Sequence, residues 1–295
     1  MSISTITERE IRSQPEVWAR AVALAPQGAP VLGRRGERVL VLGCGTSAFV
    51  AESLAVLRER AGQGETDAAY ASEWTPGRTY DRVVVISRSG TTSEVLEALD
   101  RVPAGTVRAA VVGVAGSPVD DAADETLVLD FANEESVVQT RFPTAVLALA
   151  RAGFGEDLAP VLARVADVLA APLPADPSRF EHFVFLGRSW SYGLAQEAAL
   201  KIREAAQAWS ESYPALDYRH GPVAVAGETS LVTLFGEAEP ELSADVERTG
   251  ATVVHEDLDP LIQLVQAQRL AVALAGARGL DADAPRHLTR SVVLG

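Results

Sequence analysis

A run of hydroxyl side chains follows four consecutive apolar residues in the first third of the chain. Residues 83–86 are Val-Val-Val-Ile, and Gly90 lies among the hydroxyls that come next. These hydroxyls belong to Ser87, Ser89, Thr91 and Thr92. The apolar run predicts a strand buried on both faces, and the periodic apolar residues after it predict a helix. Hydroxyl donors, a glycine that lets the backbone approach closely and a helix N-terminus all suit an anion, so the sequence predicts a phosphate-binding turn.

The simpler interpretation of this turn is helix capping, with Thr92 as the N-cap and Glu94 in the first turn. Capping accounts for one hydroxyl and leaves the others unexplained, so we favour the phosphate site. A second turn of the same design lies earlier, where the run from Gly43 to Ser47, Gly-Cys-Gly-Thr-Ser, follows the apolar residues 39–42.

Three charged side chains occupy an otherwise apolar segment that favours a helix. Glu197, Lys201 and Glu204 are spaced i, i+4, i+7, which places them on one stripe. On an exposed helix this pattern is an ordinary ion pair that contributes roughly 0.2–0.5 kcal/mol. A helix this apolar is expected to be buried, where an unpaired charge is costly. We therefore expect the stripe to face a hydrated or liganded cavity.

A histidine followed by Gly-Pro is the next candidate for chemistry. An imidazole suits proton transfer near neutral pH, but a lone histidine at such a turn more often has a structural role. The residues themselves leave both interpretations open for His220.

Strands alternate with helices along the chain, which predicts an α/β fold with doubly wound parallel sheets. The segment around Gly43 and Ser47 aligns without a gap on the segment around Gly187 and Ser191, so we infer an internal repeat. The second half lacks the hydroxyl run and has Gly-Glu-Ala-Glu at residues 236–239, whose carboxylates would repel a phosphate. We therefore expect one phosphate turn in two similar halves.

Three prolines between residues 172 and 177 predict a semi-rigid connector between the halves. The expected organisation is an N-terminal helical segment over residues 1–25, a first domain over residues 26–172 and a second domain over residues 178–295. The N-terminal helix is expected to break at Pro15 and to end near Pro26.

The composition narrows the classes of partner. The chain has 295 residues and a formal net charge of −14, which disfavours nucleic acid and anionic membrane surfaces. No apolar run approaches a membrane span, and the first ten residues lack a signal-peptide pattern, so we expect a cytoplasmic location. Four scattered histidines and a single cysteine, Cys44, give no metal-ligand spacing, and we expect no metal.

Together these features resemble the sugar isomerase (SIS) domain family of phosphosugar-binding proteins. The resemblance is strongest to the isomerase portion of glucosamine-6-phosphate synthase and its stand-alone relatives, which include amino-sugar-phosphate deaminases and deglycases. It rests on the repeat, the Gly-Cys-Gly-Thr-Ser and Ser-Arg-Ser-Gly turns, the charged helix and the His-Gly-Pro motif. It implies two tandem SIS domains, each a flavodoxin-like three-layer sandwich.

The resemblance implies roles for the matching residues. Glu204 is expected to be the base that moves a proton between C1 and C2 of the sugar, with Glu197 and Lys201 beside it. His220 is expected to open the sugar ring in the site of a neighbouring subunit, which implies a homodimer. Such a reaction needs no cofactor. The residues expected to bind the phosphosugar are Thr46, Ser47, Ser87, Arg88, Ser89, Thr92, Val137, Gln139 and Arg290.

Three positions depart from the family pattern. Arg88 replaces a glutamine, and its guanidinium is expected either to grip phosphate in bidentate fashion or to pair with a local carboxylate. Gln139 stands where the synthase has a small serine, so the substrate is expected to differ. Arg290 replaces the active-site lysine of the synthase tail, and an arginine neither forms an imine nor acts as a base.

Two functional hypotheses follow. The first is an enzyme, a phosphosugar aldose–ketose isomerase or amino-sugar-6-phosphate isomerase/deaminase. The second is a non-catalytic phosphosugar sensor that has kept the pocket and lost the chemistry. Glutamine-dependent synthesis by this chain alone is not expected, because its only cysteine lies in the phosphate-side turn, where a packing role is expected. The sequence does not identify the sugar or show whether it carries nitrogen.

Overall fold

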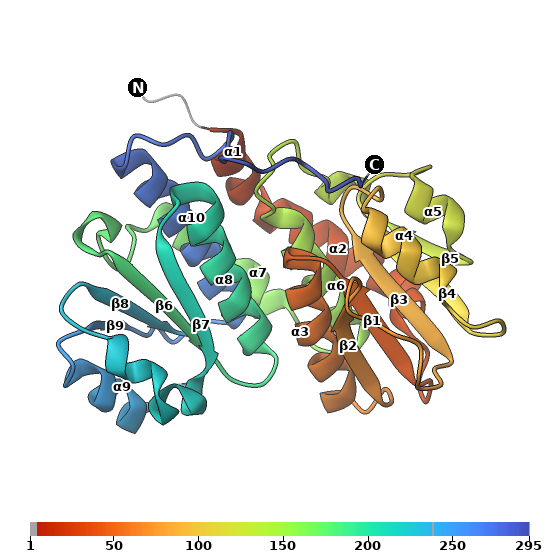
Figure 1. Ribbon diagram of the computed structural model, residues 1–295, viewed down its shortest axis with the longest axis horizontal. Helices are drawn as coiled ribbons and strands as arrows, with labels where there is room; N and C mark the ends of the chain where they lie inside the picture. The colour runs from red at the N-terminus through yellow and green to blue at the C-terminus, as the bar shows by residue number, and fades with distance from the viewer. Residues whose placement is uncertain (1–4, 238, 295) are drawn as a thin grey trace. The chain divides into compact units, whose positions relative to one another are not determined.

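The computed structural model describes residues 5–237 and 239–294 (Figure 1). The chain forms two compact units. We call the unit made of Ser13–Leu162 and Thr289–Gly295 the first-sheet unit. The unit made of Met1–Arg12 and Ala163–Leu288 is the second-sheet unit.

The first-sheet unit contains a fully parallel sheet of five strands in the order β2-β1-β3-β4-β5. The strands are β1 (Val39–Gly43), β2 (Thr66–Tyr70), β3 (Arg82–Ser87), β4 (Val107–Val112) and β5 (Glu125–Val128). The strand order reverses between β1 and β3, where Leu42 pairs with Val85. In an open α/β sheet, ligands bind beyond the carboxyl ends of the strands at such a switch point.

Helices cover both faces of this sheet. One face carries α3 (Thr46–Arg60), α6 (Arg141–Gly153) and α2 (Gln14–Gly28), and α2 packs along α6. The other face carries α4 (Ser93–Asp100) and α5 (Pro118–Ala122). Alternate strand residues such as Leu40 and Val83 pack against Val95 and Leu99 of α4. The strands are therefore buried on both sides, as their continuous apolar runs predict.

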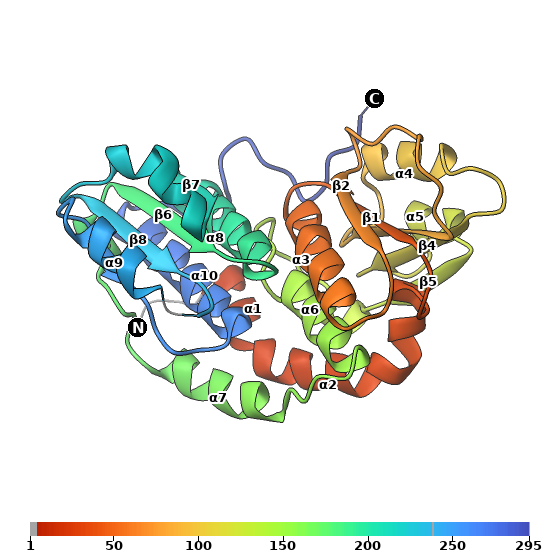
Figure 2. The ribbon, with the colours of Figure 1, turned by 90° about the horizontal axis from the view of Figure 1, so that it is seen from below.

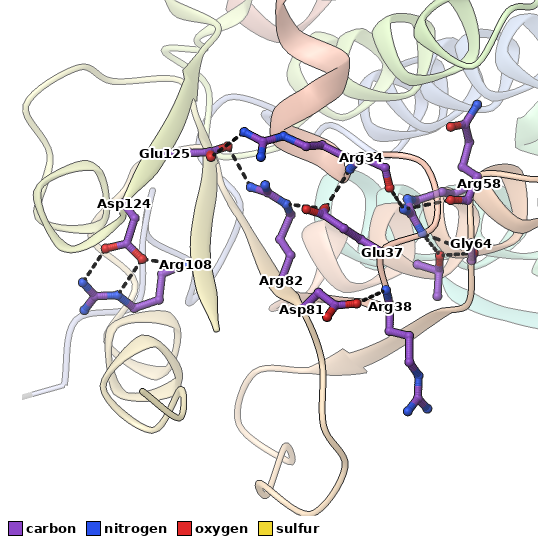
Figure 3. Close-up of polar contacts among 12 residues, drawn as sticks. Arg34, Glu37, Arg38, Arg58, Gly64, Asp81, Arg82, Arg108, Asp124 and Glu125 are labelled. Atoms are coloured by element: carbon purple, nitrogen blue, oxygen red, sulfur yellow. Dashed lines mark hydrogen bonds and ion pairs between the residues drawn. The ribbon is translucent and has the colours of Figure 1, made fainter. Parts of the chain in front are cut away.

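A network of arginines and carboxylates closes the amino-terminal edge of the first sheet (Figure 3). The Arg82 side chain is fully buried, and its Nε and Nη1 lie 2.9 and 2.8 Å from carboxylate oxygens of Glu37 and Glu125. Burial lowers the pKa of Arg82, and the two glutamates raise it by more. Arg58 donates to the carbonyls of Arg34 and Gly64 in the same region. This edge lies opposite the carboxyl ends of the strands, so we assign the network a structural role.

The second-sheet unit contains four parallel strands in the order β7-β6-β8-β9, which repeats the first four positions of the first sheet. The strands are β6 (His182–Gly187), β7 (Trp209–Pro214), β8 (Ser230–Leu234) and β9 (Thr252–Val254). One face carries α8 (Ser191–Ala206) and α10 (Pro260–Ala277), and the other carries α9 (Pro240–Glu247) and the short helix η4 (Ala215–His220) (Figure 2). α1 (Ile6–Arg12) packs against α10, and α7 (Ala159–Ala170) precedes this sheet in the chain.

The first strand–helix turns of the two sheets share two backbone features. A Cβ atom at Gly43 would lie 2.4 Å from the carbonyl carbon of Ser47, and one at Gly187 would lie 2.3 Å from the carbonyl oxygen of Ser191. Two residues further on, Gly45 and Ser189 have φ angles of 53° and 58°. The gap-free alignment therefore pairs positions with the same local geometry, and the predicted α/β class with parallel sheets is confirmed.

Some predicted boundaries are wrong. The N-terminal helix breaks at Ser13 rather than at Pro15, because a proline in the first turn of α2 needs no N–H partner. α2 also continues through Pro26 to Gly28, so that proline interrupts only the last turn. Besides η4, the described residues form four short 3₁₀ segments: η1 (Ala29–Leu32), η2 (Asp130–Ala132), η3 (Pro177–Arg179) and η5 (Pro222–Val225).

The compact units also end elsewhere than the predicted domains, which were residues 26–172 and 178–295. Residues 163–172 lie in the second-sheet unit, where Arg269 of α10 donates to the carbonyls of Val168 and Ala171. Residues 289–294 were expected in the second domain and lie in the first-sheet unit. The amide of Ser93 donates to the Val292 carbonyl, which ties the tail to α4.

Within residues 5–237 and 239–294, every helix is too short or too polar to cross a lipid bilayer.

Candidate phosphosugar site

The predicted phosphate turn lies at the switch point of the first sheet. Residues 87–92 follow β3, and the turn from Gly43 to Ser47 follows its neighbour β1. The fold therefore brings the two hydroxyl-bearing turns to one edge, where α3 and α4 both begin. Thr46 and Ser47 open α3 and are each 4% exposed, after an N-cap at Gly45 that has no side chain to cap the helix.

The hydroxyls of the β3 turn contact one another and the turn backbone. Ser87 Oγ lies 3.3 Å from Thr92 Oγ1 and accepts a hydrogen bond from the Gly90 amide at 3.2 Å. Ser89 Oγ accepts from the amide of Thr91 at 3.2 Å. Gly90 has a φ of 67°, and a Cβ there would lie 1.9 Å from Ser117 Oγ, so this position requires glycine.

Thr92 occupies the N-cap position of α4, but its side chain forms no capping hydrogen bond. Thr92 is thus the N-cap that the simpler interpretation expects, but its hydroxyl contacts Ser87 rather than a backbone amide of the helix. The Ser93 amide at the start of α4 donates to the Val292 carbonyl, and the dipole of the helix favours an oxyanion near the hydroxyls that precede it.

The C-terminal residues return to this turn, which the sequence did not predict. Thr91 Oγ1 lies 3.0 Å from Ser291 Oγ, and the Leu294 amide donates to Ser93 Oγ at 2.9 Å. Together with the Ser93 to Val292 backbone bond, these contacts lay the tail along the start of α4. Ser291 is thus a hydroxyl of this site that no sequence motif indicates.

Arg88 joins three segments of the first-sheet unit. Its side chain is buried, with Nη1 donating to the Ser136 carbonyl at 2.7 Å and Nη2 to the Arg290 carbonyl at 2.6 Å. Neither predicted partner, a phosphate or a carboxylate, accounts for these two bonds. Arg290 is exposed, and its Nη2 donates to Asn133 Oδ1 at 2.8 Å. The arginine pair therefore holds the tail against the loop that follows β5.

That loop, residues 133–140, is organised by a buried glutamate that sequence analysis did not select. Glu134 Oε1 accepts from the amide and hydroxyl of Thr140 and from the amide of Arg141, so it caps the start of α6. The loop carries Val137 and Gln139, both half-buried. The Gln139 Oε1 atom is buried and accepts no hydrogen bond from the described residues.

Cys44 packs against the apolar core beside the β1 turn, as expected of a packing residue. Burial and the nearby Glu94 carboxylate raise the pKa of its thiol to about 11. Cys44 is therefore a neutral thiol at physiological pH and a poor nucleophile. Among the described residues, no three His, Cys, Asp or Glu side chains gather into a metal-binding group.

The charged stripe predicted on α8 is a buried ion triad. Lys201 Nζ lies 3.1 Å from Glu197 Oε1 and 2.5 Å from Glu204 Oε2. The Glu197 and Lys201 side chains are each 1% exposed, and that of Glu204 is 18% exposed. Glu204 is therefore the member of the triad that solvent or a ligand reaches.

Opposing effects act on the lysine of this triad. Burial lowers the pKa of Lys201, and the charges of Glu197 and Glu204 raise it by more, so the pKa lies above its ordinary value. Lys201 is an ammonium at neutral pH. One ammonium and two carboxylates give the triad one net negative charge when both carboxylates are ionised. A substrate can reach this charge only at Glu204, the partly exposed member.

His220 ends the short helix η4 and is exposed. Its side chain forms neither a hydrogen bond nor an ion pair with the described residues. Tyr218, two positions earlier, is buried in the core. Gly221 follows with a φ of 149°, which is why a glycine precedes Pro222. The α8 triad and His220 belong to the second-sheet unit, and the predicted phosphate residues belong to the first-sheet unit.

Part of the first half of the chain matches a known domain family. Residues 34–152 match the model of the SIS domain. The isomerizing glutamine–fructose-6-phosphate aminotransferase of Thermotoga maritima is 25% identical, over 88% of this chain and 52% of that protein. Its counterpart from Thermus thermophilus is 28% identical, over 97% of this chain and 58% of that protein. The chain thus spans about half the length of the curated relatives it matches.

Solved structures match the chain over nearly its whole length. A glucosamine-6-phosphate deaminase from Thermotoga maritima superposes with a TM-score of 0.86 at 27% identity, over 98% of this chain and 100% of that chain. The tagatose-6-phosphate ketose/aldose isomerase of Escherichia coli has a TM-score of 0.76 at 19% identity, over 99% and 96%, which shows a shared fold. Residues 34–152 therefore belong to the SIS domain family, and the resemblance predicted from the motifs is confirmed.

Proposed function

We propose that the protein is a phosphosugar aldose–ketose isomerase or an amino-sugar-6-phosphate isomerase/deaminase. The observation that carries the proposal is the buried Glu197–Lys201–Glu204 triad on α8. Two carboxylates and an ammonium are expensive to bury for stability alone, and residues with such perturbed environments are concentrated at functional sites. The hydroxyl turn of the SIS domain supplies the matching phosphate site.

In the proposed reaction Glu204 acts as a single base. Its carboxylate removes the proton from C2 of the open-chain aldose, the C2–H electron pair forms a C1=C2 double bond, and the aldehyde oxygen takes a proton from water. The protonated Glu204 then returns its proton to C1, and the C2 hydroxyl or amine gives one proton back to water as it becomes a carbonyl or an imine. If nitrogen is attached at C2, water hydrolyses the imine and releases ammonia. No electron acceptor is needed.

Lys201 remains protonated through both steps. Its ammonium lies 2.5 Å from the Glu204 carboxylate and holds the base in place. The phosphate turn is proposed to bind the phosphate of the sugar, and a substrate fixed in this way reacts at a lower entropic cost. His220 is proposed to open the ring in the site of a partner in a homodimer.

Replacing Glu204 tests this assignment. Glu204→Gln keeps the size of the side chain and removes the base, so turnover of glucosamine 6-phosphate or fructose 6-phosphate should fall by about 10²–10⁴-fold, with little change in phosphosugar affinity. Glu247→Gln makes the same chemical change on an exposed face of α9 and should leave turnover unchanged. Equal turnover in wild type and Glu204→Gln would show that another group moves the proton.

A sensor that binds phosphosugar without turnover remains the second candidate. It is favoured by one observation, namely that Arg290, which never acts as a base, is held by Asn133 at the position of the family lysine. Saturable binding of the phosphosugar by wild type without any chemical change would support the sensor over the enzyme.

A further inference from the structure

A cavity of about 320 Å³ lies in the second-sheet unit, between α1 and α10. This volume is at the lower end of the range of roughly 300–1,000 Å³ typical of small-molecule sites. Ile11, Val272 and Leu280 give it an apolar lining, and Arg12 and Arg269 are its two cationic residues. A mostly apolar hollow with a few charged groups is the usual composition of a ligand pocket.

The two arginines of the cavity differ in how firmly they are held. Arg269 is half-buried, and its Nη1 and Nη2 each donate at 2.7 Å to the carbonyls of Val168 and Ala171 at the end of α7. Those bonds fix the plane of its guanidinium. Arg12 is exposed and is bound on its own helix by Glu8, with Nη2 2.8 Å from Oε1.

The charge around the cavity is not balanced. Two arginines and Glu8, the acidic residue of the lining, leave one net positive charge. Burial, and then the charge of Arg12, lower the pKa of Arg269, and the charge of Glu8 raises it by less. An anion bound in this cavity would balance the remaining positive charge.

The helix wall of the cavity has an unexplained glycine. Gly276 is the penultimate residue of α10 and is exposed. A Cβ atom there would meet nothing within 4 Å, so packing within the described chain does not require glycine. Gly279, with a φ of 69°, lies beyond the helix end, so Gly276 is not the helix terminator. Glycine at position 276 keeps the cavity wall open.

We propose that this cavity binds a small molecule in which one oxyanion, a carboxylate or a phosphate, is joined to a short apolar chain. Planar guanidinium groups bind both oxyanions in bidentate fashion, and the apolar lining accommodates the chain. The proposal is independent of the phosphosugar site, since its lining residues come from α1, α10 and the segments around Leu173 and Leu280.

Calorimetric titration of the full chain tests the proposal with octanoate and octyl phosphate as the two oxyanion probes. Either probe should bind with a stoichiometry of one, and the tighter of the two identifies the preferred oxyanion. Octanol and octylamine, which keep the apolar chain and lack the negative charge, should bind at least about tenfold more weakly. Equal binding of octanol would show that the arginines do not select the ligand and would overturn the proposal.

Two variants locate the binding in this cavity. Arg12→Gln should weaken octanoate binding about three- to tenfold, whereas Arg248→Gln, which removes another exposed arginine paired with a carboxylate of its own helix, should not. Gly276→Leu should abolish binding while the protein remains folded by thermal melting. Octanoate affinity that is unchanged in both variants would contradict the proposal. The proposal would also be wrong if neither probe binds and the Gly276→Leu variant dissociates an oligomer. The residues that line the cavity would then contact a second copy of the chain.

Discussion

At the scale of single residues, Lys201 decides whether the α8 triad is stable. Its ammonium lies 3.1 Å from Glu197 Oε1, and both side chains are almost fully buried. Removing one partner of a buried ion pair leaves an uncompensated charge, which is more damaging than replacing the whole pair by apolar groups.

Lys201→Met should therefore destabilise the protein by about 3–5 kcal/mol, measured by urea unfolding at pH 7.5. The double variant Glu197→Gln/Lys201→Met removes the stranded charge as well and should recover part of this loss. A loss below about 1 kcal/mol in Lys201→Met would mean that Glu197 is hydrated or protonated rather than held by the lysine.

The raised pKa of Lys201 also sets the direction of a pH effect. A cation whose pKa is higher in the folded state stabilises the fold fully below its unfolded pKa, near 10.5, and this contribution is lost as pH rises through the folded value. Wild-type stability should fall from about pH 10.5 upward. The difference in stability between wild type and Lys201→Met should shrink over the same interval, and a difference that stays constant would contradict the assignment.

Cys44 offers a second test at this scale. Because burial and Glu94 raise its pKa to about 11, iodoacetamide should alkylate the folded protein far more slowly than the urea-unfolded protein at pH 8. The rate in the folded state should rise steeply only above pH 10. Rapid alkylation at pH 8 would show an accessible thiolate and a different role for this turn.

The sequence predicted which residues share one face of a helix, but it did not predict which groups the polar side chains bind. The spacing of Glu197, Lys201 and Glu204 predicts one stripe, because helical geometry is local. Arg88 donates to the backbone carbonyls of Ser136 and Arg290. Every residue has a backbone carbonyl, so the sequence cannot single out these two. For the same reason Glu134 and Ser291 were missed.

At the scale of elements, the strand–turn–helix units behave as their sequences predict. Continuous apolar runs became buried parallel strands, and glycine at the end of β1 and β6 lets each following helix approach closely. Helix ends were less predictable, since α2 passes Pro26 and ends at Gly28. Local proline rules do not include the packing of α2 along α6, which favours a longer helix.

Gly43→Ala should cost about 1–3 kcal/mol, because its Cβ would meet backbone atoms that cannot give way. Gly77→Ala in the same unit provides the matched control, since the nearest atom to its Cβ lies 4.0 Å away. Thermal unfolding of the two variants measures the difference. Equal melting temperatures would show that the β1 turn relaxes without loss.

The network at the amino-terminal edge of the first sheet should be sensitive to acid. Burial raises the pKa of Glu37, and its bonds and charge interactions with Arg82 and Arg34 lower it by more, so the net pKa lies below the ordinary 4.5. Its contribution to stability is present above pH 4.5 and lost as pH falls through the folded value. Stability measured from pH 6 to pH 3 should decline less in Glu37→Gln than in the exposed control Glu73→Gln. Parallel declines would exclude Glu37 from the acid response.

At the scale of the whole molecule, we propose that the SIS domain of the first-sheet unit binds phosphate and that α8 of the second-sheet unit transfers the proton. The repeat predicted from the sequence explains why both units use the same strand order. The sequence did not predict that the last residues return to the first unit, because hydrogen bonds of Ser291 and Leu294 to α4 depend on tertiary structure. The proposed function therefore claims that the first unit binds phosphate and the second unit transfers the proton.

Proton NMR of glucosamine 6-phosphate and fructose 6-phosphate with the protein in deuterated water tests that claim most directly. The account predicts deuterium incorporation at C1 or C2 with wild type, loss of incorporation with retained binding in Glu204→Gln, and weakened binding in Thr92→Val but not in the exposed control Thr79→Val. Tight binding by wild type without any exchange would contradict the proposed proton transfer. Failure of both sugars to bind, while exchange occurs in an unphosphorylated sugar, would contradict the phosphate assignment.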